Sequence, residues 1–400
     1  MTDFDRDDAW RRWRSQWSLP QSVTYLNHGS FGPSPVVVQQ SRQQWSERLE
    51  AQPMEFFLRR MEDHLEEASG RLGRFVGAEA ADLVFVENAT HGMNIVAANL
   101  DLKSEDEVLC TDHEYGAVLR IWRRTCKNAG ARAVVRQLPV QIESDEELVE
   151  TFLQGVTDKT RLIVVSHVTS QTAMILPVEK ICSRAREKGV PVCIDGPHAL
   201  AMLPVNLKQL GCDYYTASCH KWLSAPFGTG FLYVARHRHQ NLKPAVISWG
   251  RSVSGRPLNW KDEFTWIGTH DPTSFLSVPS AIDFLKSCGL DTFRDRTHAL
   301  ARYARQRLTE LTGLELLVPD SRTWYGSMIT VPLPSSGNKP PKSGERDPLQ
   351  DALWEQHQIE VPILHRRGRR FVRVSCHLYN SPEDIDRLVD AFRELMATKL

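Results

Sequence analysis

The sequence lacks a long apolar run, paired cysteines and a net charge. No apolar run approaches the roughly 20 residues that a membrane-spanning helix needs, and the charged N-terminus lacks the apolar core of a signal peptide. Lysine plus arginine and aspartate plus glutamate number 49 each, so no global field attracts nucleic acid or an anionic membrane. We therefore predict a cytoplasmic protein with a small-molecule partner, without nucleic acid or membrane contacts.

Disulfide, metal and dinucleotide signatures are also missing. The eight cysteines are scattered without a C-x-x-C pair, a pattern typical of buried thiols in a reducing compartment. His113-Glu114 could open a zinc motif, but Ala117 stands where the second histidine would fall, so we predict no metal. The glycines at 228 and 230 precede an expected strand instead of joining a strand to a helix, which argues against a nicotinamide oxidoreductase.

Strand-like and helix-like segments alternate along the first half of the chain. The expected strands are residues 81–87, 107–110, 131–138, 161–165 and 190–195, and the expected helices are 93–100, 115–128, 144–155 and 178–189. This alternation predicts an α/β fold, with a mostly parallel sheet flanked by helices and ligands at the carboxyl ends of its strands.

The length predicts more than one domain, because single cores rarely keep growing beyond about 250–300 residues. We expect an N-terminal arm at 1–35 that contributes to the small domain and the active site, a large domain at 36–290 and a smaller C-terminal α/β domain at 291–400. A loop rich in proline, glycine and serine is expected at 332–344.

Two local clusters have structural explanations. Trp10, Trp13 and Trp17 share one helical face among arginines, and a helix packed on its own protein or on a dimer mate is favoured over membrane binding. The basic cluster at 366–370 is interpreted as a solvated hairpin tip, not as a nucleic-acid site, in a chain without net charge.

The residues with the strongest chemical signal are Lys221 and Asp195. Lys221 follows the hydroxyl- and imidazole-bearing residues Ser218 and His220, and a desolvated lysine amine can act as nucleophile and as base. Asp195 ends an apolar strand, a costly place for a carboxylate without a partner. Together they suggest a Schiff base to pyridoxal phosphate (PLP), with Asp195 keeping the ring nitrogen protonated.

Other segments can supply the remaining contacts of such a cofactor. The helix that begins after Asn88-Ala89-Thr90 can bind a phosphate at its N-terminus, although Thr90 could equally be an ordinary cap. Either His113 or Tyr115 could stack on the ring. Arg373 could bind a substrate carboxylate, with Arg369 and Arg370 as competing arginines.

These motifs, in this order, resemble those of the class V aminotransferases, which are fold-type I PLP enzymes. The resemblance rests on Asn88-Ala89-Thr90, Asp195-Gly196-Pro197-His198, Ser218-Cys219-His220-Lys221-Trp222, Gly268-Thr269, and Arg373-Val374-Ser375 with Tyr379-Asn380. Residues 25–32 and 113–117 are similar to the isopenicillin N epimerase-like subgroup, which also holds carbon–sulfur lyases. The resemblance therefore implies a PLP fold of type I, with a large and a small domain.

The resemblance also implies roles for individual residues. Lys221 would form the Schiff base, and Asp195 would contact the ring nitrogen. Tyr115, in preference to His113, would stack on the ring. Arg373 would bind the substrate carboxylate. The further cofactor contacts would be Ala89, Thr90, Ser170, His198, Ser218, His220 and, from the other subunit of a homodimer, Thr269. The N-terminal loop would add Asn27, His28 and Ser30 around the substrate.

The reaction is less well defined by the sequence. A cysteine desulfurase needs a mobile cysteine late in the small domain, but residues 314–372 contain none, and Cys376, on the strand of Arg373, is expected to serve in packing. We predict an epimerase that removes the Cα proton of an amino acid with Lys221. Tyr115 or the loop at 27–30 would supply the second acid. A carbon–sulfur lyase, an aminotransferase and a silent binding protein are the alternatives.

Overall fold

The computed structural model describes residues 8–139, 141–250, 257–335, 341 and 345–397. Parts of the predicted arm (1–7) and of the predicted loop (336–340 and 342–344) lie outside the described residues. Within the described part, no helix is long and apolar enough to cross a bilayer. All eight cysteines are free, and only Cys288 is more than slightly exposed, as expected for packing thiols.

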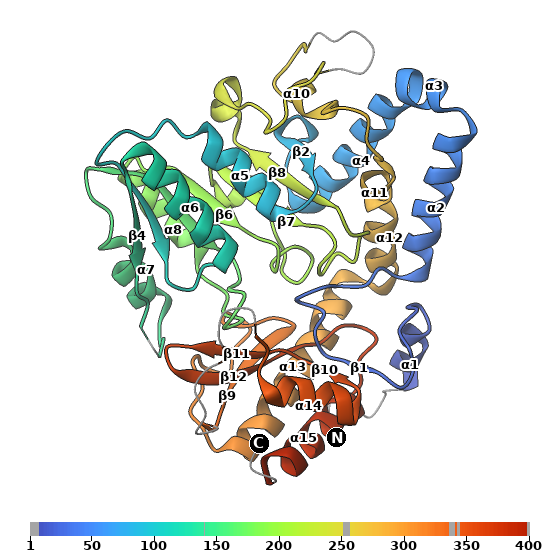
Figure 1. Cartoon of the computed structure of the whole chain (residues 1–400), viewed down its shortest axis with the longest axis vertical. Coiled ribbons are helices and arrows are strands. Elements are labelled where there is room, and N and C mark those ends of the chain that lie inside the picture. Colours follow the sequence, from blue (N-terminus) through green and yellow to red (C-terminus); the bar gives the residue numbers. More distant parts are fainter. Residues whose placement is uncertain (1–7, 140, 251–256, 336–340, 342–344, 398–400) are drawn as a thin grey trace.

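A seven-stranded sheet forms the centre of the larger unit (Figure 1). Its order is β2 (Leu83–Val86), β8 (Gly230–Val234), β7 (Tyr214–Ser218), β6 (Val192–Asp195), β5 (Thr160–Ser166), β3 (Glu107–Thr111) and β4 (Arg132–Arg136). Strand β8 runs antiparallel to both of its neighbours, and all other adjacent pairs are parallel. The prediction of a mostly parallel sheet is confirmed.

Helices cover both faces of this sheet because successive strand residues point to opposite sides. In β3, Val108 and Cys110 pack into the cluster formed with α5 (Ala89–Asn99) and α6 (Gly116–Ala129). Leu109 packs into the opposite cluster, formed with α7 (Asp145–Leu153), α8 (Val178–Glu187) and α12 (Val278–Cys288). The buried strands therefore read as continuous apolar runs in the sequence.

The smaller unit is built on a three-stranded antiparallel sheet, in the order β11 (Ile363–Arg366), β12 (Arg369–Ser375) and β9 (Met328–Leu333). Helices α13 (Leu290–Thr312), α14 (Pro348–His357) and α15 (Pro382–Ala397) accompany it. The N-terminal strand β1 (Thr24–Tyr25) pairs in parallel with β10 (Ile359–Glu360), so both chain ends lie with this unit (Figure 1).

The remaining helices lie along the side of the large sheet or in connections. They are α1 (Asp8–Arg14), α2 (Val36–Ala51), α3 (Pro53–Glu55), α4 (Met61–Val76), α9 (Leu207–Leu210), α10 (Asp262–Thr265) and α11 (Thr273–Leu276). Trp13 and Trp17 meet the ring of Phe284 edge to face, with ring centroids 5.6 and 5.3 Å apart. The prediction that this aromatic segment packs on its own protein is confirmed.

The basic cluster at 366–370 forms the tip of the β11–β12 hairpin, as predicted, and the residues of its turn, Arg367 to Arg369, are exposed. Arg366 donates to the Asp112 carbonyl and to its carboxylate, each at 2.6 Å, and Arg367 also pairs with that carboxylate. Arg370 pairs with the buried Asp347. The prediction of a solvated tip is confirmed for the turn. Arg366 and Arg370, on either side of it, pair with Asp112 and Asp347, whose largely buried carboxylates need cationic partners.

Candidate active site

The predicted site residues meet at one edge of the large sheet because of the strand directions. Strands β5, β6 and β7 are parallel, and β2 has the same direction as β7 because both run antiparallel to β8. Asp195 ends β6, Lys221 follows β7 and Ser170 follows β5. Side chains far apart in the sequence therefore converge at the carboxyl ends of the strands.

The backbone of Lys221 is held from two sides. Its carbonyl accepts hydrogen bonds from the Ser224 amide at 2.8 Å and from Nε2 of His28 at 3.0 Å. Ser224 has φ +56°, a left-handed conformation that costs a non-glycine residue of order 1 kcal/mol or more unless its surroundings enforce it. The turn that carries the lysine is thus fixed by contacts outside its own sequence.

His28 belongs to the N-terminal loop and lies beneath this turn, fully buried. Since the Lys221 carbonyl can only accept, Nε2 of His28 carries the proton, and Nδ1 accepts from the Tyr379 hydroxyl at 2.9 Å. Burial lowers the pKa of His28 to about 3, so the ring is neutral. A Cβ at Gly32 would lie 2.6 Å from this ring, so the loop approaches closely only with glycine there.

The amine of Lys221 lies beside His198. Nζ is 3.1 Å from Nε2 of His198, whose Nδ1 accepts from the indole of Trp222 at 3.3 Å. The neutral imidazole therefore has its proton on Nε2 and donates to a lone pair of an uncharged amine. Burial, with the positive charge of Arg373, lowers the pKa of Lys221 to about 7. The lysine is therefore available as a nucleophile near neutral pH.

Asp195 is a buried carboxylate that receives no hydrogen bond from any residue in the described part of the chain. It is 5% exposed, and burial raises its pKa to about 7, an effect that the charge of Lys221 opposes. A carboxylate in such a place is costly without a donor. The protonated nitrogen of a pyridine ring would supply that donor.

The start of α5 forms an anion-binding end of the site. The Ser218 hydroxyl accepts from the Ala89 amide at 3.0 Å, and the Asn88 side chain caps the helix by accepting from the His91 amide at 2.9 Å. Nδ1 of His220 is buried and has no partner in the described chain. Together with the exposed Thr90 in the first helical turn, these groups fit a phosphate.

Arg373 gathers the residues predicted to bind the substrate. Its guanidinium donates to the Ser170 carbonyl at 2.7 Å, to Oδ1 of Asn27 at 3.2 Å and to the Ser30 hydroxyl at 2.5 Å, while Nε has no partner in the described chain. It is 4% exposed, and burial lowers its pKa to about 10, so it stays charged at neutral pH. Among the described residues no carboxylate pairs with Arg373, which makes it a receptor for a carboxylate ligand.

Replacing Arg373 with alanine is expected to raise the Michaelis constant for an amino acid by about 10- to 100-fold. A hydrogen bond to a charged group contributes about 1.5–3 kcal/mol. The absorption band of the bound cofactor should not change, because Arg373 faces the substrate end of the site. Arg369→Ala is the matched control, since this exposed arginine lies on the same strand. An unchanged Michaelis constant in Arg373→Ala would remove the assignment.

Both candidates for the stacking group lie after β3. His113 is 6% exposed and contacts the Thr172 hydroxyl through Nδ1 at 2.9 Å, whereas Tyr115 is 49% exposed and lies close enough to Arg373 to influence its pKa. Thr269 is exposed, in the segment between α10 and α11, where it could reach a neighbouring subunit. The assignments of Tyr115 and Thr269 stay predictions.

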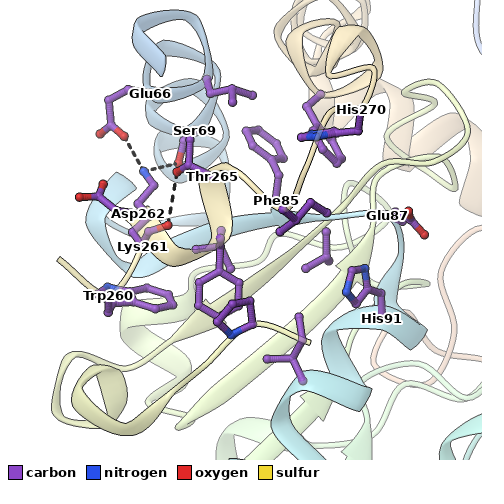
Figure 2. Close-up of a pocket in the computed structure, with 18 of the residues that line it drawn as sticks. Glu66, Ser69, Phe85, Glu87, His91, Trp260, Lys261, Asp262, Thr265 and His270 are labelled. Carbon is purple, nitrogen blue, oxygen red and sulfur yellow. Dashed lines mark hydrogen bonds and ion pairs between the residues drawn. The ribbon is translucent and has the colours of Figure 1, made fainter. Parts of the chain in front are cut away.

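A cavity of about 900 Å³ lies beside the phosphate end of the site (Figure 2). It is bordered by β2, α4 and α10, with His91 and Glu87 at its side towards α5 and Trp260 and Lys261 on the far side. Lys261 there binds Glu66, Ser69 and the Ala80 carbonyl. None of the residues predicted to act on the cofactor or the substrate lines this cavity.

The fold and this site define a PLP enzyme of fold type I, and the chain belongs to the aminotransferase class-V family, whose model matches residues 25–388. The chain is 36% identical to an isopenicillin N epimerase of Amycolatopsis lactamdurans, over 97% of this chain and 98% of that protein. It is 28% identical to a probable chloroplastic L-cysteine desulfhydrase of Arabidopsis thaliana, over 93% and 82%. The structure of a C-DES lysine mutant with glycine covalently linked to its PLP cofactor superposes with a TM-score of 0.80, at 20% identity over 94% and 98%.

Family membership makes pyridoxal 5′-phosphate the cofactor, and the described residues fit it. In the described part of the chain, the Asp195 carboxylate has no hydrogen-bond donor and Nδ1 of His220 has no partner, while the lowered pKa of Lys221 makes its amine available near neutral pH. Sequence reasoning missed the supports of this arrangement, Trp222 and the pair of His28 with Tyr379. These residues lie within the recognised motifs, but the spacing of a motif does not show which distant residues its side chains contact.

Proposed function

We propose that the chain is an amino-acid epimerase of the isopenicillin N epimerase type, acting at Cα. The observation that carries the proposal is the juxtaposition of an uncharged Lys221 amine with an Arg373 site for a carboxylate, in a chain similar to such an epimerase along almost its whole length. A carboxylate held by Arg373 fixes one substituent of Cα. Lys221 can then exchange the proton at that carbon.

The chain's own residues divide the work. When bound, pyridoxal phosphate supplies an electron-accepting ring that lowers the cost of breaking a bond at Cα. Lys221 would hold the cofactor aldehyde and would afterwards accept the Cα proton at Nζ, while His198 fixes the position of that amine. Asp195 would keep the ring nitrogen protonated, and the first turn of α5 with Ser218 and His220 would hold the phosphate.

Inversion also needs a proton donor on the face opposite Lys221. We propose Tyr115 for this role, because it is the hydroxyl-bearing side chain at the carboxyl end of β3 that lies near Arg373 and keeps half of its surface free. Ser30 is less suited, since its hydroxyl already accepts a hydrogen bond from Arg373. Asn27 is likewise held between Arg373 and Glu360.

The second candidate is a carbon–sulfur lyase, favoured by the similarity to a probable L-cysteine desulfhydrase. Such a reaction begins with the same loss of the Cα proton and needs only a leaving group at Cβ, so the residues above serve it equally. A desulfurase is disfavoured, because Cys376 is fully buried directly after β12, and residues 314–372 contain no cysteine to accept sulfur.

The reactions separate when isopenicillin N and cysteine are each incubated with the protein in deuterated water. The epimerase proposal expects deuterium at Cα together with the inverted centre, and no ammonia. Pyruvate with ammonia from cysteine would instead identify a lyase, and a keto acid with the amine transferred to the cofactor would identify an aminotransferase. Tyr115→Phe should keep deuterium exchange at Cα while losing inversion, and retained inversion would remove Tyr115 from the role.

We also propose a homodimer in which Thr269 reaches the phosphate of the neighbouring site. The proposal is supported by family membership and by the exposure of Thr269 on its own chain. Sedimentation equilibrium should give twice the 45.6 kDa of one chain, and Thr269→Ala should weaken cofactor retention. A monomer that binds the cofactor equally well would contradict it.

A further inference from the structure

A second carboxyl group, Glu114, is buried near Asp195 and has no part in the site described above. It is 4% exposed, Oε1 accepts from the Thr111 hydroxyl at 2.6 Å and Oε2 accepts from the Ser166 hydroxyl at 2.6 Å. Both hydroxyls are themselves buried. No lysine, arginine or histidine of the described chain pairs with this carboxyl, so its uncharged form is favoured.

The position of Ser166 connects Glu114 to the reactive centre. Ser166 and Asp195 are partners in the parallel pairing of β5 with β6, and register partners of this kind project to the same face of a sheet. The face in question is the one covered by α5 and α6, where Cys193 and Val164 precede these two residues by two positions. Glu114, just before α6, closes that side of the site.

The two carboxyls also interact electrostatically. Burial is the main reason that the pKa of Glu114 is raised to about 8, and the charge of Asp195 raises it further, against the hydrogen bonds from Ser166 and Thr111. The other titratable groups that face Glu114 are Cys110 of β3 and Cys193 of β6, whose thiols are kept neutral by burial. Ionisation of Glu114 would therefore place a second negative charge on the Asp195 side of the site.

We propose that Glu114 is a positioning residue that stays protonated at neutral pH, so that Asp195 is the one charged carboxylate on this side of the cofactor ring, and that its loss of a proton at alkaline pH shifts the absorption band of the ring electrostatically. The ring nitrogen is already protonated beside Asp195, so an extra negative charge here acts on the ring through its electric field. Once Glu114 ionises, the cofactor site has one more negative charge. The ionisation of Glu114 therefore sets the alkaline limit of the charge state that the site has at neutral pH. The inference rests on cofactor binding and not on which reaction follows.

The test compares the visible absorption band of the cofactor-loaded protein, without substrate, from about pH 6 to about pH 10. Wild type should show a spectral step near pH 8, and Glu114→Gln should lack it while having the wild-type band at neutral pH, because the amide is uncharged throughout. Glu107→Gln is the matched control, since Glu107 is a buried glutamate at the start of β3, the strand that precedes Glu114, and this variant should retain the step. A step that persists in Glu114→Gln, or a changed band at neutral pH, would overturn the proposal.

Two further measurements keep the test decisive if Glu114→Gln folds poorly. Ser166→Ala removes a hydrogen bond that favours the ionised form, so the step should move to higher pH, and an unmoved step counts against Glu114. In the cofactor-free protein, a raised carboxyl pKa means that the folded state holds the extra proton. Stability should therefore fall as pH rises from the unfolded value of 4.5 to about 8, and less so in Glu114→Gln. This last comparison needs no cofactor, so it separates failure of the inference from failure of the cofactor assignment.

Discussion

Lys221→Ala is expected to lower turnover by at least about 10²- to 10⁴-fold, the usual contribution of a positioned proton-transfer group. The loss should be larger still if covalent attachment of the cofactor limits the rate. The reason is that Nζ of Lys221 is held by His198 and has a pKa lowered to about 7, so the uncharged amine is available near neutral pH. Steady-state rates of Cα proton exchange in deuterated water measure the effect.

The control for this variant is Lys188→Ala, which removes an exposed lysine after α8 and should leave the exchange rate unchanged. A small external amine can replace the missing base in Lys221→Ala, so partial recovery of exchange on adding methylamine would separate chemistry from misfolding. Exchange at the wild-type rate without any added amine would contradict the role of Lys221.

Asp195→Asn is expected to lower the rate by about 10²- to 10³-fold, comparable to removal of one preorganised group that faces developing charge. Asparagine preserves the shape of the side chain but cannot hold the ring nitrogen in its protonated form. The cofactor should still attach to Lys221, with a shifted absorption band and weaker retention. Turnover and equilibrium dialysis of the cofactor measure the two effects.

Stability separates this functional role from a structural one. Because burial raises the pKa of Asp195 to about 7, the folded cofactor-free protein holds the extra proton, and its stability falls as pH rises from 3.8 to about 7. Cofactor-free Asp195→Asn should therefore be at least as stable as wild type near pH 8. Asp213 directly precedes β7, at the end away from Lys221, and forms ion pairs with His237 and Arg238. Asp213→Asn should therefore lose stability but little activity. A destabilised but fully active Asp195→Asn protein would contradict the account.

Much of the site follows from local sequence signals. Alternating apolar strands and amphipathic helices predict a parallel sheet, and the rule that ligands bind at its carboxyl edge places Asp195 and Lys221 together. The structure confirms the sheet and brings Arg373 to Asn27, Ser30 and Ser170, all of which the motifs had named. The prediction of the sheet succeeds because each strand depends on its own residues and the turn that follows it. The residues around Arg373 had been named only by the family resemblance, and their roles stay predictions.

The contacts that sequence reasoning missed are those between distant segments. Strand β7 was not predicted as a strand, because small and hydroxyl-bearing residues at 216–218 resemble a turn, yet both of its neighbours in the sheet satisfy its backbone. The hydrogen bond from His28 to Lys221 spans 193 residues, and the pairing of Arg366 with Asp112 spans 254. No spacing rule reports such contacts, since tertiary packing alone decides them.

The most direct test of the central claim is to reduce the cofactor-loaded protein with borohydride, digest it and locate the modified lysine by mass spectrometry. Reduction makes the bond between the cofactor and its lysine permanent. We expect a single pyridoxyl adduct, on the peptide that carries Lys221, and none in Lys221→Ala. An adduct on another lysine, or a protein that gains neither colour nor adduct with pyridoxal phosphate, would contradict it.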